Sequence, residues 1–267
     1  MSICQKKAVL LLVMIVGVCP SVCPSVHPTS IVVGATPDGI MIVADSRATN
    51  TTLSGKTSAD DTKCKIVMLG SDFIFAETGS EGYTPDDTTD TLKEWHGTTE
   101  AINAFRDAGG ADIRKVVDAW AQRISDHFED FFLVRPARAR QLEGLFGIFA
   151  GRNADIGVTA YMAAVTLDGH VAPVVDIRRI LPKATPSSTH PITQELIDGQ
   201  SDRAKSVAGA WNKESSGVPL AQKRVRWLEF LIEQTGQFDS NVGGPTNSIE
   251  LDRNSPPTWI NNRTCGV

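Results

Sequence analysis

The chain has 267 residues, of which 41% are apolar and 21% charged, a composition typical of one compact domain with a large core. Its formal net charge is −5 at pH 7, which argues against nucleic acid as the main partner because phosphate binding needs a clustered basic surface. No zinc-type Cys/His spacing and no phosphate-binding glycine loop occur, so we expect neither a metal nor a cofactor. Five scattered histidines are expected to be surface or hydrogen-bonded residues: His27, His96, His127, His170 and His190.

The N-terminal segment is typical of a targeting sequence. Lys6 and Lys7 precede the apolar run 8–19, which has the length of a signal h-region and is short for a membrane span. We therefore expect a signal peptide or propeptide at 1–28, a single domain at 29–267, and a secreted or periplasmic location. The alternative is an uncleaved anchor or a buried strand, and only an uncleaved 8–19 would bring the protein to a membrane.

The rest of the chain predicts alternating pairs of strands and helices. Apolar runs bounded by turn residues indicate β-hairpins, and the apolar side chains between Ile113 and Phe131 recur at helical spacing. The expected elements, in chain order, are a hairpin at 30–36 and 40–44, a hairpin at 65–69 and 73–76, a loop at 80–90, helices at 91–107 and 112–132, strands at 145–150, 158–166 and 171–177, helices at 193–213 and 218–234, and strands at 244–251 and 257–261.

Two of the five cysteines lie outside the expected leader. Cys64 and Cys265 would remain after its removal, and an even number is compatible with one disulfide in an oxidising compartment. Two unrelated free thiols are an equal alternative, because the sequence does not show whether these residues meet.

The residues that follow position 28 carry a more specific pattern. Asp45-Ser46-Arg47-Ala48-Thr49 ends the first hairpin, Lys65 precedes an apolar strand, and Gly79 ends the second hairpin. Counted from Thr29, this pattern resembles the proteasome β-subunit family, which also includes the peptidase of the bacterial ATP-dependent protease. A later match is Asp239, followed by a pair of glycines at 243–244.

The sequence departs from that family at several positions. Val242 stands where the family has a serine before the paired glycines, and Pro28 stands where it usually has glycine. A serine expected near the nucleophile is not cleanly placed, and Ser201 is the best candidate. Signal peptidase needs small residues before its cut, and Pro28 is unfavourable there, so we expect processing in two steps, a first cut between positions 18 and 26 and then attack of Thr29 on the Pro28 carbonyl. The fixed φ of proline restricts the turn that this second step needs.

The resemblance implies a fold and an activity. The fold would be α+β, a four-layer αββα sandwich of two antiparallel sheets, as in N-terminal-nucleophile (Ntn) hydrolases. The activity would be that of a threonine endopeptidase or amidohydrolase, which cleaves amide bonds through an acyl-enzyme on Thr29 once residues 1–28 are removed. Peptides are the first substrate class to expect, although small-molecule amides stay open because a fold does not fix its substrate.

The resemblance also implies a role for each matched residue. Thr29 would supply the Oγ nucleophile and, through its free α-amine, the base. Lys65 would favour the neutral amine and the developing alkoxide, Asp45 would orient Lys65, and Asp239 would contact the amine region. The backbone N–H of Gly79 would bind the oxyanion. In addition, Arg47 would bind carbonyls of the following loop and belongs to the substrate side, while Lys63 is the fallback for Lys65.

Two other interpretations stay open at this point. The chain could be an inactive proteasome-like binding or structural subunit that retains its propeptide, which would leave Thr29 without a free amine. Assembly into a homo-oligomer is compatible with the resemblance, in a small oligomer or an open ring. The residue at the mature N-terminus distinguishes the enzyme from the inactive subunit.

Overall fold

The computed structural model describes residues 30–36, 38–51, 57–85, 91–110, 112–139, 144–153, 157–167, 172–180, 194–197, 220–237 and 240–265. Thr29, Ser201, Asp239 and the expected leader 1–28 lie outside these ranges. Among the described residues, no helix is both long enough and apolar enough to cross a membrane.

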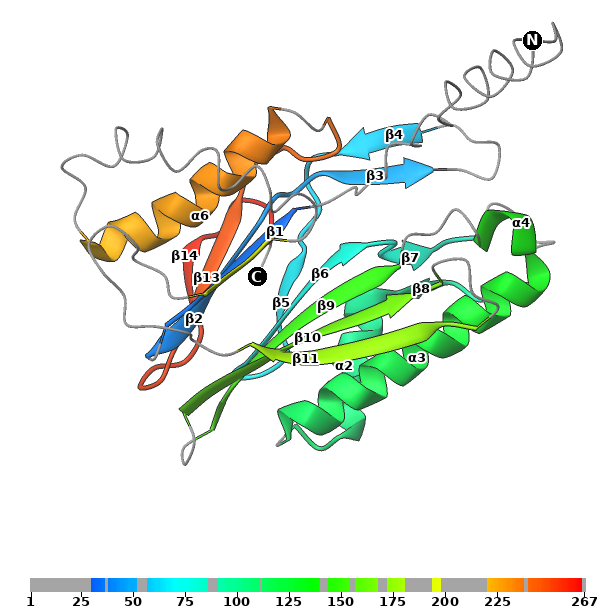
Figure 1. Ribbon diagram of the computed structural model, residues 1–267, viewed down its shortest axis with the longest axis horizontal. Coiled ribbons are helices and arrows are strands. Elements are labelled where there is room, and N and C mark those ends of the chain that lie inside the picture. The colour runs from blue at the N-terminus through cyan, green and yellow to red at the C-terminus, as the bar shows by residue number, and fades with distance from the viewer. Residues whose placement is uncertain are drawn as a thin grey trace, which may run out of the picture.

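Two five-stranded antiparallel sheets form the centre of the molecule (Figure 1). The first sheet has the order β12-β1-β2-β13-β14, made of Gln194–Ile197, Ile31–Ala35, Gly39–Ala44, Asn247–Asp252 and Thr258–Asn261. The second has the order β11-β10-β9-β6-β5, made of Val174–Ile180, Gly157–Thr166, Leu145–Asn153, Phe73–Gly79 and Ile66–Met68. The fold is therefore α+β with antiparallel sheets.

The expected hairpins are present, and the strands of the first one are buried on both faces. In β1 and β2 every residue is buried, with Ile31 opposite Ala44 and Val33 opposite Ile42. Alternate side chains enter two different cores, because successive residues of a strand point to opposite faces. Val33 and Ile42 pack between the two sheets, whereas Val32 packs on the opposite face of the first sheet, with buried residues of the helix at 220–236.

Helices cover the outer faces of both sheets (Figure 1). Helix α6 (Leu220–Gly236) contacts β1 and β2, while α2 (Gly97–Asp107) and α3 (Ile113–Val134) contact β6, β9 and β10. Asp112 caps α3 by accepting hydrogen bonds from the backbone N–H groups of residues 114 and 115. Trp120 of α3 is fully buried against Phe75 and Phe149, so this apolar face fixes the helix on the second sheet.

Several expected elements differ from the structure. The segment Gln194–Ile197 is strand β12, paired with β1, so the helix expected at 193–213 is wrong there; its remainder lies outside the described residues. The helix expected at 91–107 begins only at Gly97, because Trp95–His96 (β8) pairs with Gly82–Tyr83 (β7) inside the expected loop. A second small hairpin, β3 (Ala48–Thr51) with β4 (Thr57–Asp60), and the short helix α4 (Pro136–Ala139) were not expected.

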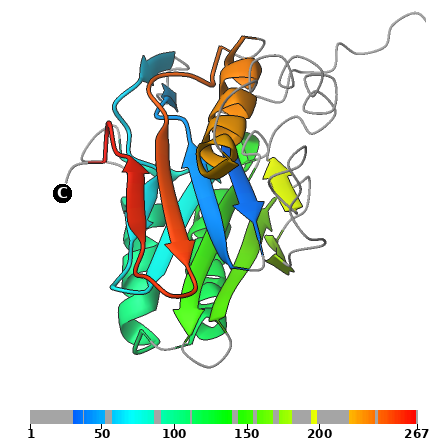
Figure 2. The same cartoon turned by 90° about the vertical axis from the view of Figure 1, so that its left-hand side faces the viewer.

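A disulfide joins the edges of the two sheets. Cys64 precedes β5, Cys265 follows β14, and their sulfur atoms are bonded across 201 residues of sequence. Figure 2 shows β14 at the edge of the first sheet. Of the two alternatives that the sequence left open for these cysteines, the structure shows the bonded one.

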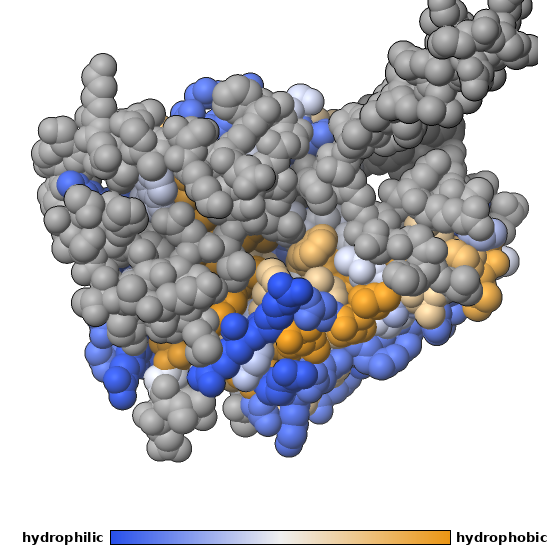
Figure 3. Space-filling view, viewed as in Figure 1, coloured by the Kyte–Doolittle hydropathy of each residue, from blue (hydrophilic) through white to orange (hydrophobic). Residues whose placement is uncertain are grey.

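Strand β11 forms the outer edge of the second sheet and has an exposed surface. Val174 and Val175 are both exposed at one end of this strand. Figure 3 shows apolar surface next to strongly hydrophilic surface on the face that carries β11.

Candidate functional site

A buried ion pair lies where the two sheets face each other. Asp45 directly follows β2 of the first sheet, and Lys65 directly precedes β5 of the second. Lys65 Nζ lies 3.0 Å from Asp45 Oδ1, and both side chains are completely shielded from solvent. Charges in such a setting need partners, because an unpaired buried ion is costly.

Backbone amides complete the surroundings of the Asp45 carboxylate. The N–H of Ser30 donates to Oδ1 at 3.0 Å, and the N–H of Gly243 donates to Oδ2 at 2.9 Å. Burial raises the pKa of Asp45, while the charge of Lys65 and these two N–H groups act against the rise. The carboxylate thus connects the residue after Thr29, the lysine and the glycine pair near the end of the chain.

Lys65 has further oxygen neighbours. Its Nζ donates a hydrogen bond to the backbone carbonyl of Arg47, and it lies 3.9 Å from Oε1 of Glu81. Lys63 differs, because its side chain is half-buried and its backbone N–H binds the Ser46 carbonyl at 3.1 Å. The geometry therefore brings Lys65, rather than the fallback Lys63, to Asp45.

Arg47 holds the loop that carries Gly243. Its Nε and Nη2 form a bidentate ion pair with Asp61, at 2.6 and 2.8 Å, and its Nη1 donates to the Ser240 carbonyl at 2.8 Å. In the described part of the following loop, Arg47 thus binds the Asp61 carboxylate, whereas we expected it to bind loop carbonyls. The carbonyl that it does bind belongs to Ser240, next to Asp239. The pair with Asp61 lowers the pKa of that carboxyl.

Gly79 occupies a position that only glycine fits well. Its φ is +103°, and a Cβ there would lie 2.4 Å from the carbonyl oxygen of Gly144. The neighbouring N–H of Ser80 donates to the same Gly144 carbonyl at 2.7 Å. Backbone geometry alone accounts for this glycine, and its predicted role as an oxyanion donor stays a prediction.

Glu77 is a buried carboxyl that sequence reasoning missed. It lies on β6 across from Lys65, whose carbonyl accepts its backbone N–H at 3.1 Å. Oε1 accepts a hydrogen bond from Thr98 Oγ1 at the start of α2, while Oε2 has no hydrogen-bond partner in the described part of the chain. Burial, followed by the charge of Glu81, raises the pKa of Glu77 to about 8, so the carboxyl is largely protonated at neutral pH.

The structure brings together only part of the predicted site. Asp45, Lys65 and Arg47 meet around the Gly243 backbone, whereas Thr29 and Asp239 fall outside the described residues. Reasoning from sequence missed Glu77 and Glu81. Glu77 directly follows the apolar run 73–76, and a charged residue at that place in a strand could have drawn attention to it. No local feature of the sequence marks Glu81.

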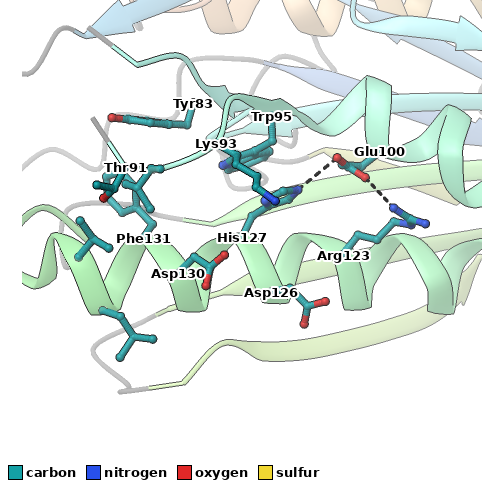
Figure 4. A pocket seen from close by; sticks show the side chains of 13 residues that line it. Tyr83, Thr91, Lys93, Trp95, Glu100, Arg123, Asp126, His127, Asp130 and Phe131 are labelled. Carbon is teal, nitrogen blue, oxygen red and sulfur yellow. Dashed lines mark hydrogen bonds and ion pairs between the residues drawn. The ribbon is translucent and has the colours of Figure 1, made fainter. Parts of the chain in front are cut away.

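A separate hollow of about 440 Å³ lies between β7–β8 and the C-terminal half of α3. Figure 4 shows Glu100 between Arg123 and His127, which contact it at 3.2 and 3.1 Å. The His127 ring stacks on Trp95, which confirms the expectation that this histidine is satisfied within the protein. Neither Asp45 nor Lys65 lines this hollow, so it is distinct from the ion pair.

The described residues form no group of three or more His, Cys, Asp or Glu side chains that could hold a metal ion. No family model matches the chain, and no curated protein matches it. Among solved structures, the chain is similar to a mutant of Anbu from Hyphomicrobium sp. strain MC1, with a TM-score of 0.48 and 10% identity over 87% of each chain. At this level of similarity the likeness carries no argument about function.

Proposed function

We propose that this protein is a threonine-type hydrolase of the Ntn superfamily, which cleaves amide bonds, peptides foremost, through an acyl-enzyme on Thr29 after removal of residues 1–28. One observation carries the proposal: the N–H of Ser30 binds the same Asp45 oxygen that holds Lys65 Nζ. Because Thr29 directly precedes Ser30, the proposal requires its amine and hydroxyl to reach this buried ion pair.

The chemistry needs a positive charge beside that residue. Once the chain begins at Thr29, its α-amine has an ordinary pKa of about 7.7–8.0, and the nearby Lys65 favours the neutral form that accepts a proton. Thr29 Oγ would attack the substrate carbonyl carbon and pass its proton to this amine. The amine would then protonate the leaving nitrogen as the C–N bond breaks, and a water molecule would hydrolyse the resulting ester.

The remaining residues have supporting roles in this proposal. Asp45 keeps Lys65 charged and oriented, and the Gly79 N–H stabilises the oxyanion. Asp239 would contact the amine. The adjacent Ser240 carbonyl accepts a hydrogen bond from Arg47, which lies two residues after Asp45. Arg47 would act through this loop rather than touch substrate.

The architecture and the disulfide support the same proposal. Helix α6 packs on the first sheet, the two sheets face each other, and α2 and α3 pack on the second, which supports a four-layer αββα sandwich as part of the proposal. The Cys64–Cys265 bond favours an oxidising compartment, consistent with an expected secreted or periplasmic location after removal of the leader.

The test is the intact mass of the protein purified from its oxidising compartment, for the wild type, Thr29→Ala and Thr29→Ser. We expect the wild-type chain to begin at Thr29 and the alanine variant to keep residues before it. The serine variant, which retains a hydroxyl, should be processed, although more slowly. A wild-type chain that keeps the same residues as the alanine variant would refute the proposal and leave the inactive binding subunit as the explanation.

A further inference from the structure

We propose that the C-terminal segment 263–265 is a positioning element for Lys65, fastened by the Cys64–Cys265 disulfide, so that opening this bond weakens the site. This inference concerns the hydrolase proposed above, but its first test does not depend on hydrolysis. Cys265 follows the edge strand of one sheet, and Cys64 is bonded in sequence to Lys65 at the edge of the other. The disulfide is therefore a covalent link between the two sheets at the ion pair.

Lys65 directly precedes a short strand at the edge of its sheet. β5 has only three residues, lies at the edge of its sheet and pairs there only with β6. Asp45, by contrast, follows β2, which lies between β1 and β13. An edge strand has hydrogen-bonded strand neighbours on one side only, so we expect the backbone on the Lys65 side of the pair to open more readily than that on the Asp45 side.

Asn247 fixes the C-terminal segment on the Asp45 side. This residue is completely buried, and in β13 it lies opposite Ala44, the residue before Asp45. Its Oδ1 accepts the N–H groups of Arg263 and Thr264 at 2.9 and 3.0 Å, and its Nδ2 donates to Thr264 Oγ1 at 2.6 Å. Such a satisfied side chain makes the segment a rigid support.

The same segment contacts the Lys65 side directly. Thr264 Oγ1 donates to the Lys63 carbonyl at 3.3 Å, and Cys265 is bonded to Cys64. The supports thus run from Asn247, through Thr264 and Cys265, to the two residues that precede Lys65. Breaking the disulfide removes the covalent part of this connection. Among the described residues, the hydrogen bond from Thr264 Oγ1 to the Lys63 carbonyl remains.

Reduction by a dithiol is the reaction that would open the bond. A dithiol thiolate attacks one of the two Sγ atoms, the Sγ–Sγ bond breaks, and the other cysteine leaves as a thiolate. The second dithiol sulfur then attacks the dithiol sulfur of the mixed disulfide and releases the remaining cysteine thiolate. Two electrons and two protons end on Cys64 and Cys265, and the dithiol becomes a cyclic disulfide. Reoxidation reverses these steps.

The first test measures the access of Lys65 to an amine-acylating reagent, followed by mass spectrometry. The proteins are the wild type, the wild type reduced with dithiothreitol, and Cys64→Ser/Cys265→Ser. We expect Lys65 to be acylated about tenfold faster in the two open forms, while Lys115 on α3 reacts at an unchanged rate. Ile124→Val, a mild core variant in the helical layer, is the control for general loss of stability and should leave Lys65 protected.

The second test separates positioning from folding. If peptide hydrolysis is observed, opening the disulfide should lower kcat about tenfold with little change in KM, because the lysine acts on the reacting atoms. Unchanged acylation of Lys65 in the reduced wild type, with two thiols titrated, would overturn the proposal, as would two free thiols in the protein as purified. Faster acylation without any hydrolase activity would keep the positioning role and refute the proposed function instead.

Discussion

Replacement of Glu77 by glutamine should change how the stability of the protein depends on pH. The Glu77 carboxyl is buried, its Oε2 has no hydrogen-bond partner among the described residues, and its pKa rises from 4.5 to about 8. A glutamine amide has nearly the shape of the protonated carboxyl and does not titrate. Glu77→Gln therefore retains the neutral form at every pH.

The sign follows from where the proton is bound. In the unfolded chain Glu77 loses its proton near pH 4.5, whereas in the folded protein it keeps the proton until about pH 8. Between these values the folded state binds more protons, so the Glu77 contribution to stability is full at low pH and falls as pH rises. Each pH unit in this window corresponds to about 1.4 kcal/mol, so the whole loss is on the order of 5 kcal/mol above pH 8.

Urea unfolding of the wild type and Glu77→Gln from pH 5 to pH 9, followed by tryptophan fluorescence, measures this difference. All other groups titrate in both proteins, so subtracting the two free energies of unfolding isolates Glu77. We expect the glutamine variant to gain relative to the wild type with every pH step and to level off above pH 8. A difference that stays constant across this range would refute the reasoning, because it would mean that Glu77 is already ionised in the folded protein.

Five further variants, at four residues, test the site. Asp45→Asn removes the nearer of the two carboxylates beside the buried Lys65 ammonium, leaving Glu81 at 3.9 Å, and should lower the free energy of unfolding by about 3 kcal/mol, measured in urea. Lys65→Met should abolish N-terminal processing, whereas Lys65→Arg should keep part of it, as judged by intact mass. Gly79→Ala forces a side chain into a positive-φ position against the Gly144 carbonyl and should cost about 1–3 kcal/mol in thermal or urea unfolding. Arg47→Lys loses the bidentate contact with Asp61 but, since the pair is partly exposed, should cost no more than about 1 kcal/mol in the same assay.

Strong local patterns predicted much of the fold correctly. The hairpins at 30–44 and 65–76 and the helix at 112–132 agree with β1–β2, β5–β6 and α3, because a run of alternating or helically spaced apolar residues leaves few other ways to bury it. The helix predicted at Gln194–Ile197 was wrong for the opposite reason. Its residues include good helix formers, and only pairing with the distant β1 makes them a strand.

The sequence predicted only those residues of the candidate site whose spacing matches the proteasome-like pattern. The resemblance indicated Asp45 and Lys65, and the structure places their charged atoms 3.0 Å apart. Glu77 stands out in the sequence only as a polar residue that continues an apolar run, and Asn247 has no local signal, because the burial of both depends on segments that are distant in sequence. The same holds for Cys64 and Cys265, since a bond across 201 residues cannot be inferred from either end.

The energetics of the ion pair bear on why such a site exists. A buried salt bridge is seldom more stabilising than apolar residues of the same volume, although removal of one partner is costly. Stability alone therefore does not account for Asp45 and Lys65 in the protein interior. The proposed hydrolase would account for them, because an N-terminal nucleophile at the residue before Ser30 would need a fixed positive charge that favours a neutral amine and a stabilised alkoxide. The Ser30 N–H and the Cys64–Cys265 disulfide both connect to this buried pair, and this is why the proposed mechanism begins with Thr29.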